Sequence, residues 1–410
     1  MSGNWVKKLA SAVSGSQPAP SEEPEVSNRQ KRLRLIHAIE ERRQSRVVSY
    51  ITADRQGAEG QIGRDAVRPM YNHIRVLGFE PVPRIDLFLY SQGGVVDVPW
   101  RLVTMLREYC QELSVLVPYK AHSAATLIVL GADEIVMGKK GELGPIDPIL
   151  TRQHQGEQQS VVWEQMSVED VMAYIAFLKE RVGLDDEAAM GDNVKVLAER
   201  LPPWVIGSIY RTQSHIRLIA RKLLASHHQP LADEKIDPII DILAEKMYFH
   251  GHAIGRREAE ELGLPVVRPD RELEDVMWQL FEAYEQLMQL DRPLQTIPPD
   301  KEELEMPITL ACIESEARLD VYRGQFRLRN VRQMPPQLNL NLNLGLQLPP
   351  GLKPDQLPAE AHKVLQSMLQ QMHAQIPAII QAELKRQAPL VRTEWGLFNA
   401  SWQEATNEEI

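Results

Sequence analysis

Short apolar runs alternate with longer amphipathic stretches through the first half of the chain. Each run of strand length is followed by a stretch in which apolar residues recur with helical spacing. Strands are predicted at residues 47–51, 84–90, 113–117 and 133–137, and helices at 64–77, at 98–106 and in a run that opens at Ser123. Repeated strand and helix units with short connections favour stacked parallel strands with helices outside them. The pattern therefore predicts an α/β core.

Helical spacing continues on both sides of these units. A basic helix is predicted at residues 29–46, and further helices at 168–181, 201–225, 231–247 and 272–290. Residues 151–160 are polar without periodicity and indicate a mobile loop. The additional helices exceed what the repeated units need, so we expect a helical elaboration that covers the functional site or forms an oligomer interface.

Changes in composition mark the ends of this core. Residues 1–28 predict a disordered tail, because their second half is rich in Ser, Pro and Glu. We assign 29–295 to the main domain, 296–358 to a segment rich in Pro, Asn and Leu, and 359–410 to an amphipathic helix with a tail. One or two strands are expected within 308–328. Leucines at every second position from 338 to 348 fit either a strand with one apolar face or a low-complexity linker. The helix at 359–385 is expected to serve docking or oligomerisation.

Two junctions between a strand and a helix carry residues with chemical potential. Ser123 stands at a helix N-terminus, where free N–H groups and the helix dipole favour negative charge beside its hydroxyl. The alternative is a simple helix cap. Gly93 and Gly94 follow the strand at 84–90, where backbone N–H groups without a neighbouring Cβ can form one wall of an oxyanion hole. The alternative for the glycine pair is a tight turn.

The order and spacing of several short pieces resemble the serine dehydrogenase proteinase family, a branch of the ClpP/crotonase superfamily related to signal peptide peptidase A. The matching residues are Tyr90-Ser91-Gln92-Gly93-Gly94, Ala121-His122-Ser123-Ala124-Ala125-Thr126, and the stretches 131–138, 143–148 and 255–266. Gln92 stands where many relatives have proline. The resemblance implies a ClpP/crotonase-like core and a serine peptidase. It also implies that Ser123 is the nucleophile and that Gly93, Gly94 and Ala124 supply the oxyanion amides.

A serine hydroxyl needs a neighbouring base to take its proton. In the ClpP protease a histidine lies in the loop after the strand that follows the nucleophile helix. The corresponding stretch here, 144–148, contains Asp147 and no histidine. Relatives of signal peptide peptidase A instead use a lysine whose pKa is lowered by burial.

Lys179 is the first choice for that lysine, because it follows the serine at a distance and lies in a mostly apolar helix. The alternative is a surface lysine paired with a neighbouring carboxylate. Further candidate bases are Lys139 and Lys140, which follow the strand at 133–137, and His154 in the polar loop. His122 is adjacent to the nucleophile and is expected to have a structural role.

Composition narrows the possible partners. The 46 Lys and Arg residues against 56 Asp and Glu give a net charge of −10, which argues against a nucleic-acid partner. The two cysteines, Cys110 and Cys312, form neither a metal cluster nor a disulfide framework, which fits a reducing cytoplasm. No run approaches the roughly 20 apolar residues of a membrane-spanning helix. Any membrane contact is therefore expected to be peripheral, through the N-terminus.

We therefore expect a cytoplasmic serine peptidase that cleaves peptide or protein substrates, uses no cofactor or metal, and forms a homo-oligomer. Two other classes stay open. The chain could be a catalytically inactive ClpP-fold scaffold or substrate-binding protein, in which case a Ser123→Ala variant keeps its function. It could also be a crotonase-type acyl-CoA enzyme, which needs no nucleophilic serine and would leave Ser123 unlabelled by a fluorophosphonate probe.

Overall fold

The computed structural model describes residues 27–78, 80–146, 149–155, 161–246, 251–298, 301–333 and 390–405, together with single positions between 360 and 388. Contacts divide the chain into two units. The first contains Met1–Pro293, Thr309–Arg323 and Trp402–Ile410, and the second contains Leu294–Ile308 and Gly324–Ser401. The tail predicted at 1–28 falls almost wholly outside the described residues, and so do the alternating leucines at 338–348.

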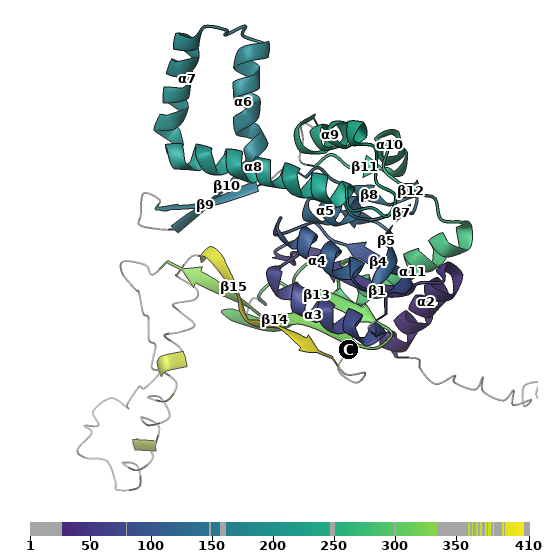
Figure 1. Cartoon of the computed structure of the whole chain (residues 1–410). Coiled ribbons are helices and arrows are strands. Elements are labelled where there is room, and N and C mark those ends of the chain that lie inside the picture. The colour runs from purple at the N-terminus through teal and green to yellow at the C-terminus, as the bar shows by residue number, and fades with distance from the viewer. Residues whose placement is uncertain are drawn as a thin grey trace, which may run out of the picture. The chain divides into compact units, whose positions relative to one another are not determined.

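A mainly parallel sheet lies at the centre of the first unit (Figure 1). Its strand order is β12, β7, β5, β4, β1 and β13, continuing through β14 and β15. The parallel strands are β1 (Arg46–Thr52), β4 (Val82–Tyr90), β5 (Cys110–Val117), β7 (Glu134–Met137) and β12 (Val266–Val267). β13 (Glu303–Ser315) runs antiparallel to β1 and precedes β14 (Leu319–Arg332) and β15 (Leu390–Glu404). The predicted α/β fold is confirmed, and the carboxyl ends of β4, β5 and β7 meet at one edge of the sheet.

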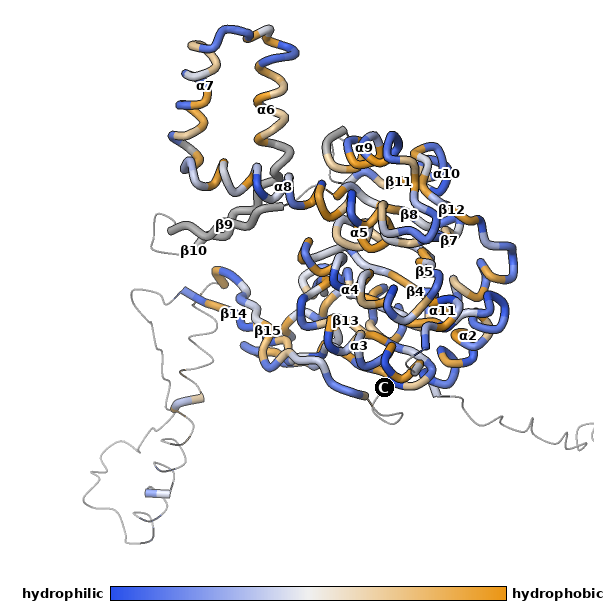
Figure 2. The backbone as a smooth tube through the Cα atoms, viewed as in Figure 1, coloured by the Kyte–Doolittle hydropathy of each residue, from blue (hydrophilic) through white to orange (hydrophobic). Residues whose placement is uncertain are grey.

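Helices cover both faces of this sheet. One face packs on α2 (Asn28–Arg43) and α11 (Arg271–Met288), and the other on α3 (Val67–Ile74), α4 (Val98–Arg107) and α5 (Ala124–Leu130). Val47 and Ile51 of β1 lie in the hydrophobic cluster on the face covered by α2 and α11. Val48 and Tyr50 lie in the cluster on the face covered by α3, α4 and α5. This alternation follows from the pleat of the strand. Every residue of α5 is buried, and the hydrophobic colouring of Figure 2 follows the strands and this helix.

Short elements complete the first unit. They are β2 (Asp54–Arg55), β3 (Ala58–Glu59), β6 (Lys120–Ala121), β8 (Glu142–Leu143), β11 (Ile254–Gly255), α9 (Asp233–Asp241), α10 (Arg256–Glu261) and helical turns at Arg64–Ala66, Arg75–Leu77 and Ile242–Lys246. The helix predicted at 64–77 is therefore α3 with a 3-10 turn at each end.

The loop predicted at 151–160 is wrong for residues 151–155. These residues belong to β9 (Ile149–Gln155), which pairs with β10 (Val161–Ser167). Backbone pairing holds this hairpin, and residues 151–155 are polar, with no apolar period to reveal a strand.

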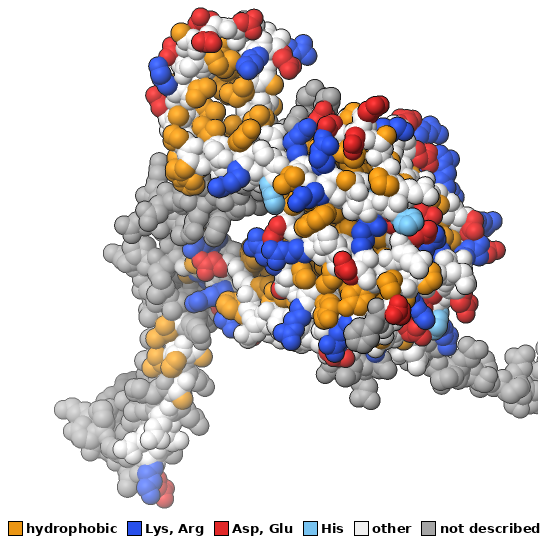
Figure 3. All heavy atoms as spheres, in the orientation of Figure 1, with side chains coloured by type: hydrophobic (Ala, Val, Ile, Leu, Met, Phe, Trp, Pro, Cys, Tyr) orange, Lys and Arg blue, Asp and Glu red, His pale blue; other side chains and the backbone are white. Residues whose placement is uncertain are grey.

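A helical arm is formed by α6 (Val168–Glu180), α7 (Glu187–Arg200) and the start of α8 (Pro203–Leu224). α6 and α8 were predicted, and α7 was not. The arm carries exposed apolar side chains, with Phe177 54% exposed, Trp204 72% and Tyr210 70%. Figure 3 shows hydrophobic side chains gathered over it. Among the helices that the structure describes, none is both long enough and apolar enough to span a bilayer.

The second unit consists of the outer parts of β13 and β14 with most of β15. Phe326 stacks on Trp395 with 5.8 Å between ring centroids, and the Arg327 guanidinium lies 4.8 Å from the centre of the Phe398 ring. The sequence predicted strands within 308–328 but only a tail where β15 lies. Described positions between 360 and 380 are helical, and the rest of the helix predicted at 359–385 falls outside the described residues.

A buried histidine ties α3 to the β13–β14 hairpin. The Nδ1 atom of His73 lies 2.8 Å from Ser315 Oγ, and its Nε2 atom lies 3.0 Å from Asp320 Oδ2. Burial lowers the pKa of His73 below its ordinary value, against the opposing effect of Asp320. As the pH falls, His73 therefore takes up a proton at a higher pH in the unfolded chain than in the folded protein. Stability from this group is full above the ordinary histidine pKa of about 6.5 and is lost below it.

We accordingly expect the free energy of unfolding to fall between pH 7 and pH 5. A His73→Gln variant, which keeps a donor and an acceptor but cannot titrate, is expected to lose less stability over the same range. Urea unfolding at both pH values measures this. Identical pH dependence in the two proteins would show that His73 does not carry the effect.

Candidate active site

Ser123 occupies a sharp turn between β6 and α5. Its backbone has φ 51° and ψ −115°, a conformation that residues with a side chain rarely adopt. Three hydrogen bonds hold the turn: His122 N–H to Ser91 O at 3.0 Å, Ala125 N–H to His122 O at 2.9 Å, and Leu127 N–H to Ser123 O at 3.1 Å. A strained turn from strand to helix is the geometry that presents a nucleophilic serine at the edge of a sheet.

The Ser123 hydroxyl does not cap the helix that it precedes. Ser123 is the N-cap residue of α5, yet its side chain makes no capping hydrogen bond. Within the described part of the chain, no acceptor or donor engages this hydroxyl, and the residue is only half-buried. The interpretation of Ser123 as a simple helix cap is therefore wrong, and its oxygen is available to a ligand.

The Gly93 backbone packs directly against Ser123. A Cβ at Gly93 would lie 2.8 Å from Ser123 Cβ, 2.9 Å from His122 O and 3.2 Å from Ala124 N, and Gly93 has φ 112°. Both the close approach and the positive φ require glycine here. The next residue, Gly94, meets the backbone of Ile62, whose N–H donates to Gly93 O at 2.8 Å. The two junctions singled out in the sequence thus come together in space.

The three amides predicted for an oxyanion hole differ in their hydrogen bonding. The Gly93 N–H donates to Ser91 Oγ at 3.0 Å and is therefore occupied. Among the described residues, the N–H groups of Gly94 and Ala124 meet no acceptor. Sequence reasoning missed the role of Ser91, although a serine that ends an apolar strand beside a glycine pair is a usable signal. The amides of Gly94 and Ala124 remain available to a developing negative charge.

Lys120, three residues before the nucleophile, belongs to a polar network. Asp54 Oδ2 accepts hydrogen bonds from Tyr90 Oη at 2.6 Å and from Lys120 Nζ at 2.7 Å. Burial by itself would lower the pKa of Lys120, but the hydrogen bond and the charge of Asp54 raise it above its ordinary value. Burial would raise the pKa of Asp54, and the same contacts lower it. Lys120 therefore stays protonated and cannot take a proton from Ser123.

Residues 21–178 match the sequence profile of the ClpP-like SDH-type serine proteinases. The similarity to that family covers this segment, which is less than half of the chain. It includes the glycine pair and Ser123, so the resemblance inferred from the short motifs is confirmed. Two relatives are uncharacterized proteins of Methanocaldococcus jannaschii. MJ0137 is 26% identical over 283 residues, which cover 66% of this chain and 85% of that protein. MJ1495 is 34% identical over 128 residues, which cover 29% of this chain and 42% of that protein.

Solved structures with similarity to the chain include two proteases. One is a mutant of the 1510-N membrane-bound stomatin-specific protease in complex with a substrate peptide. Its sequence is 16% identical, the match covers 56% of this chain and 78% of that chain, and the TM-score is 0.33. The other is ClpP1 from Listeria monocytogenes, with 13% identity, coverage of 58% and 97%, and a TM-score of 0.29.

Three of the candidate bases lie within residues 21–178, and Lys179 follows directly after them. Lys179 lies in the last turn of α6, and His154 lies in β9 opposite Val162. Lys139 Nζ is 3.4 Å from Glu274 Oε2 and Lys140 Nζ lies 4.5 Å from the centre of the Tyr119 ring, so both lysines contact other groups.

His122 likewise has partners other than the nucleophile, with Nδ1 3.0 Å from Gln92 Oε1 and Nε2 3.3 Å from Glu142 Oε1. This agrees with the structural role expected for it. Within the described residues, neither the three candidate lysines nor His122 hydrogen-bond to the Ser123 hydroxyl.

A methyl group at Gly93 is expected to displace the nucleophile. Gly93→Ala is predicted to lower hydrolysis by about 100-fold, because displacement of a reacting group by about 1 Å has an effect of this size. Gly78→Ala is the matched control, since Gly78 has φ 106° and nothing lies within 4 Å of its added Cβ. Peptide hydrolysis rates compared with thermal unfolding measure the effect. Equal activity in the two variants would contradict the close contact between Gly93 and Ser123.

Proposed function

We propose that the protein is a serine peptidase in which Ser123 Oγ attacks the carbonyl carbon of a peptide bond. A new C–O bond forms, the hydroxyl proton passes to a base, and negative charge develops on the carbonyl oxygen. The free N–H groups of Gly94 and Ala124 hold that charge. The C–N bond then breaks, the amine leaves with a proton, and water hydrolyses the acyl-enzyme. The contact of Gly93 with Ser123, beside an unengaged hydroxyl, supports this assignment.

We propose Lys179 as the general base and His154 as the alternative, following the resemblance to the signal peptide peptidase A relatives. The base is then brought to Ser123 by assembly of the homo-oligomer or by binding of the substrate.

The exposed apolar side chains of the α6–α8 arm support assembly, since large exposed apolar patches mark protein interfaces. Light scattering of the purified protein measures the oligomer, and Lys179→Ala compared with His154→Ala identifies the base. A cytoplasmic location remains a proposal.

The deciding experiment treats the purified full chain with a fluorophosphonate probe and locates the adduct by peptide mass spectrometry. The adduct is expected on Ser123, and hydrolysis of unfolded casein is expected to fall in proportion to labelling. Ser214, an exposed serine on α8, should stay unlabelled and serves as the internal control. A folded protein that neither reacts with the probe nor cleaves casein would instead be a scaffold or an acyl-CoA enzyme.

A further inference from the structure

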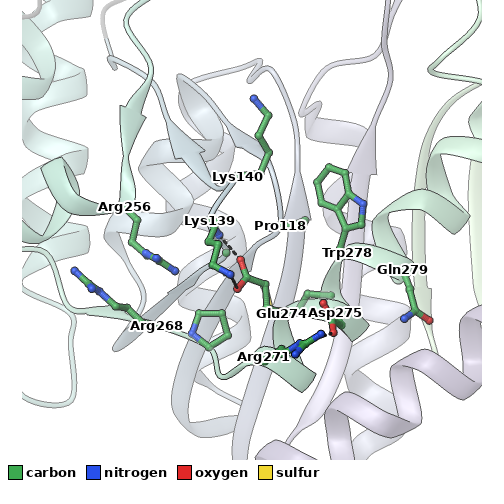
Figure 4. A pocket seen from close by; sticks show the side chains of 13 residues that line it. Pro118, Lys139, Lys140, Arg256, Arg268, Arg271, Glu274, Asp275, Trp278 and Gln279 are labelled. Atoms are coloured by element: carbon green, nitrogen blue, oxygen red, sulfur yellow. Dashed lines mark hydrogen bonds and ion pairs between the residues drawn. The ribbon is translucent and has the colours of Figure 1, made fainter.

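A cavity lies at the edge of the sheet where the parallel strands end. Its volume is about 840 Å³, and its walls come from the residues after β5 and β7 and from the first half of α11 (Figure 4). Pro118 follows β5, Gly138 follows β7, and Trp278 projects from α11. Neither Ser123 nor the glycine pair lines this cavity. It is therefore distinct from the position of attack.

Positive charge predominates in the lining. Its cations are Lys139, Lys140, Arg256, Arg268 and Arg271, and its carboxylates are Glu274 and Asp275. The lining thus has a net charge of 5 − 2 = +3, in a chain whose net charge is −10. Clefts lined by one sign of charge concentrate ligands of the opposite sign. The cavity is suited to an anionic group.

Part of this charge is already neutralised. Glu274 accepts a hydrogen bond from the Lys139 N–H at 2.6 Å and lies 3.4 Å from its Nζ. Arg268 pairs with Glu260 through two hydrogen bonds of 2.6 and 2.5 Å. Arg271 lies 3.9 Å from Asp275. Both carboxylates of the lining therefore already face cations.

Two cations of the lining remain without a carboxylate. Lys140 Nζ lies over the Tyr119 ring, and Arg256 NH1 donates to the carbonyl of Met137 at 3.3 Å. Within the described residues, neither forms an ion pair. Figure 4 shows the two side chains on different sides of the Lys139–Glu274 pair. An anionic ligand can engage them without displacing an existing ion pair.

Chain connectivity limits how far this cavity lies from the nucleophile. Pro118 precedes Ser123 by 123 − 118 = 5 residues. Five residues span at most about 18 Å between Cα atoms even when fully extended. An extended substrate has the same rise per residue. A side chain about five or six residues from the scissile bond can therefore reach the cavity wall.

We propose that the cavity is an exosite that binds acidic side chains of the substrate. Lys140 and Arg256 supply the charges that glutamate or aspartate engages, and Trp278 and Pro118 supply an apolar wall for neighbouring aliphatic groups. The favoured substrates then carry acidic residues within about six positions of the cleaved bond. This proposal builds on the peptidase function, since it names the class of substrate.

Equilibrium binding to an inactive protein tests the exosite without requiring cleavage. The full chain with Ser123→Ala is titrated by calorimetry with two synthetic peptides of about twelve residues that differ only in carrying a Glu-Glu or a Gln-Gln pair. We expect the Glu peptide to bind about tenfold more tightly, since two exposed charge pairs contribute effects of this size. High salt is expected to remove the difference through screening.

Two further variants in the same background assign the effect to the cavity. Adding Lys140→Ala and Arg256→Ala is expected to reduce the preference for the Glu peptide to less than about twofold. Lys235→Ala with Lys301→Ala, two exposed lysines outside the lining, removes the same formal charge and should keep the preference. In the active protein, the cavity variant should raise KM for the Glu peptide and leave KM for the Gln peptide nearly the same.

The outcomes separate this proposal from the peptidase function. Equal binding of the two peptides, or a preference that survives loss of Lys140 and Arg256, overturns the exosite. Binding of inorganic pyrophosphate that depends on these cations, without any peptide preference, overturns it in favour of a small-phosphate site. Failure of Ser123 to react with a fluorophosphonate overturns the peptidase instead and leaves the peptide binding result standing.

Discussion

Replacing Ser123 by alanine is expected to lower casein hydrolysis by about 10⁴-fold or more, because the covalent route is lost with the attacking oxygen. Fluorophosphonate labelling should disappear at the same time. The free amides of Gly94 and Ala124 remain in the variant, so a small residual rate over the uncatalysed reaction is compatible with the mechanism.

The same substitution is expected to leave the fold intact. The Ser123 hydroxyl makes no capping hydrogen bond, so its removal should change the free energy of unfolding by less than about 0.5 kcal/mol. Ser214→Ala, on an exposed face of α8, is the matched control and should retain full activity. A Ser123→Ala protein that still hydrolyses casein at more than a tenth of the original rate would exclude Ser123 as the nucleophile.

Replacing Glu314 by glutamine is expected to destabilise the protein by about 3–5 kcal/mol, because it leaves a buried arginine without its counter-ion. Arg32 of α2 and Glu314 of β13 are both fully buried, with Nε to Oε2 at 2.6 Å and NH2 to Oε1 at 3.2 Å. The Arg32 guanidinium also lies 5.5 Å from the centre of the Tyr284 ring. The pair thus joins α2 to the sheet in a region of low dielectric.

A neighbouring glutamate provides the control for this prediction. Glu316 is half exposed and lies 3.5 Å from Arg46, so Glu316→Gln should cost less than about 1 kcal/mol. The double replacement Arg32→Met with Glu314→Met should cost less than Glu314→Gln alone, since Arg32 is then not left buried without its counter-ion. Urea unfolding at constant pH measures all three variants. Equal losses for Glu314→Gln and Glu316→Gln would show that burial does not govern the strength of this pair.

The sequence by itself determined the α/β class and the two junctions that carry the chemistry. Apolar runs and helical spacing are local properties, and they predicted β1, β4, β5, β7, α2, α4 and α11 within a few residues. The positions of Ser123 and of the glycine pair were also evident, because a sharp turn needs particular residue types within a few positions. Residues 151–155 of β9 are polar and carry no such local signal.

Only the tertiary structure decided which of these residues meet and which groups stay free. The contact of Gly93 with Ser123 depends on the register of β4 against β5 and on the bridge between Ser91 and Ala121. The protonated state of Lys120 depends on Asp54, which lies 66 residues away in the sequence. The cationic cavity likewise combines residues from 118 to 279. Side-chain charge and hydrogen bonding depend on partners that the fold brings together, and local sequence patterns do not encode them.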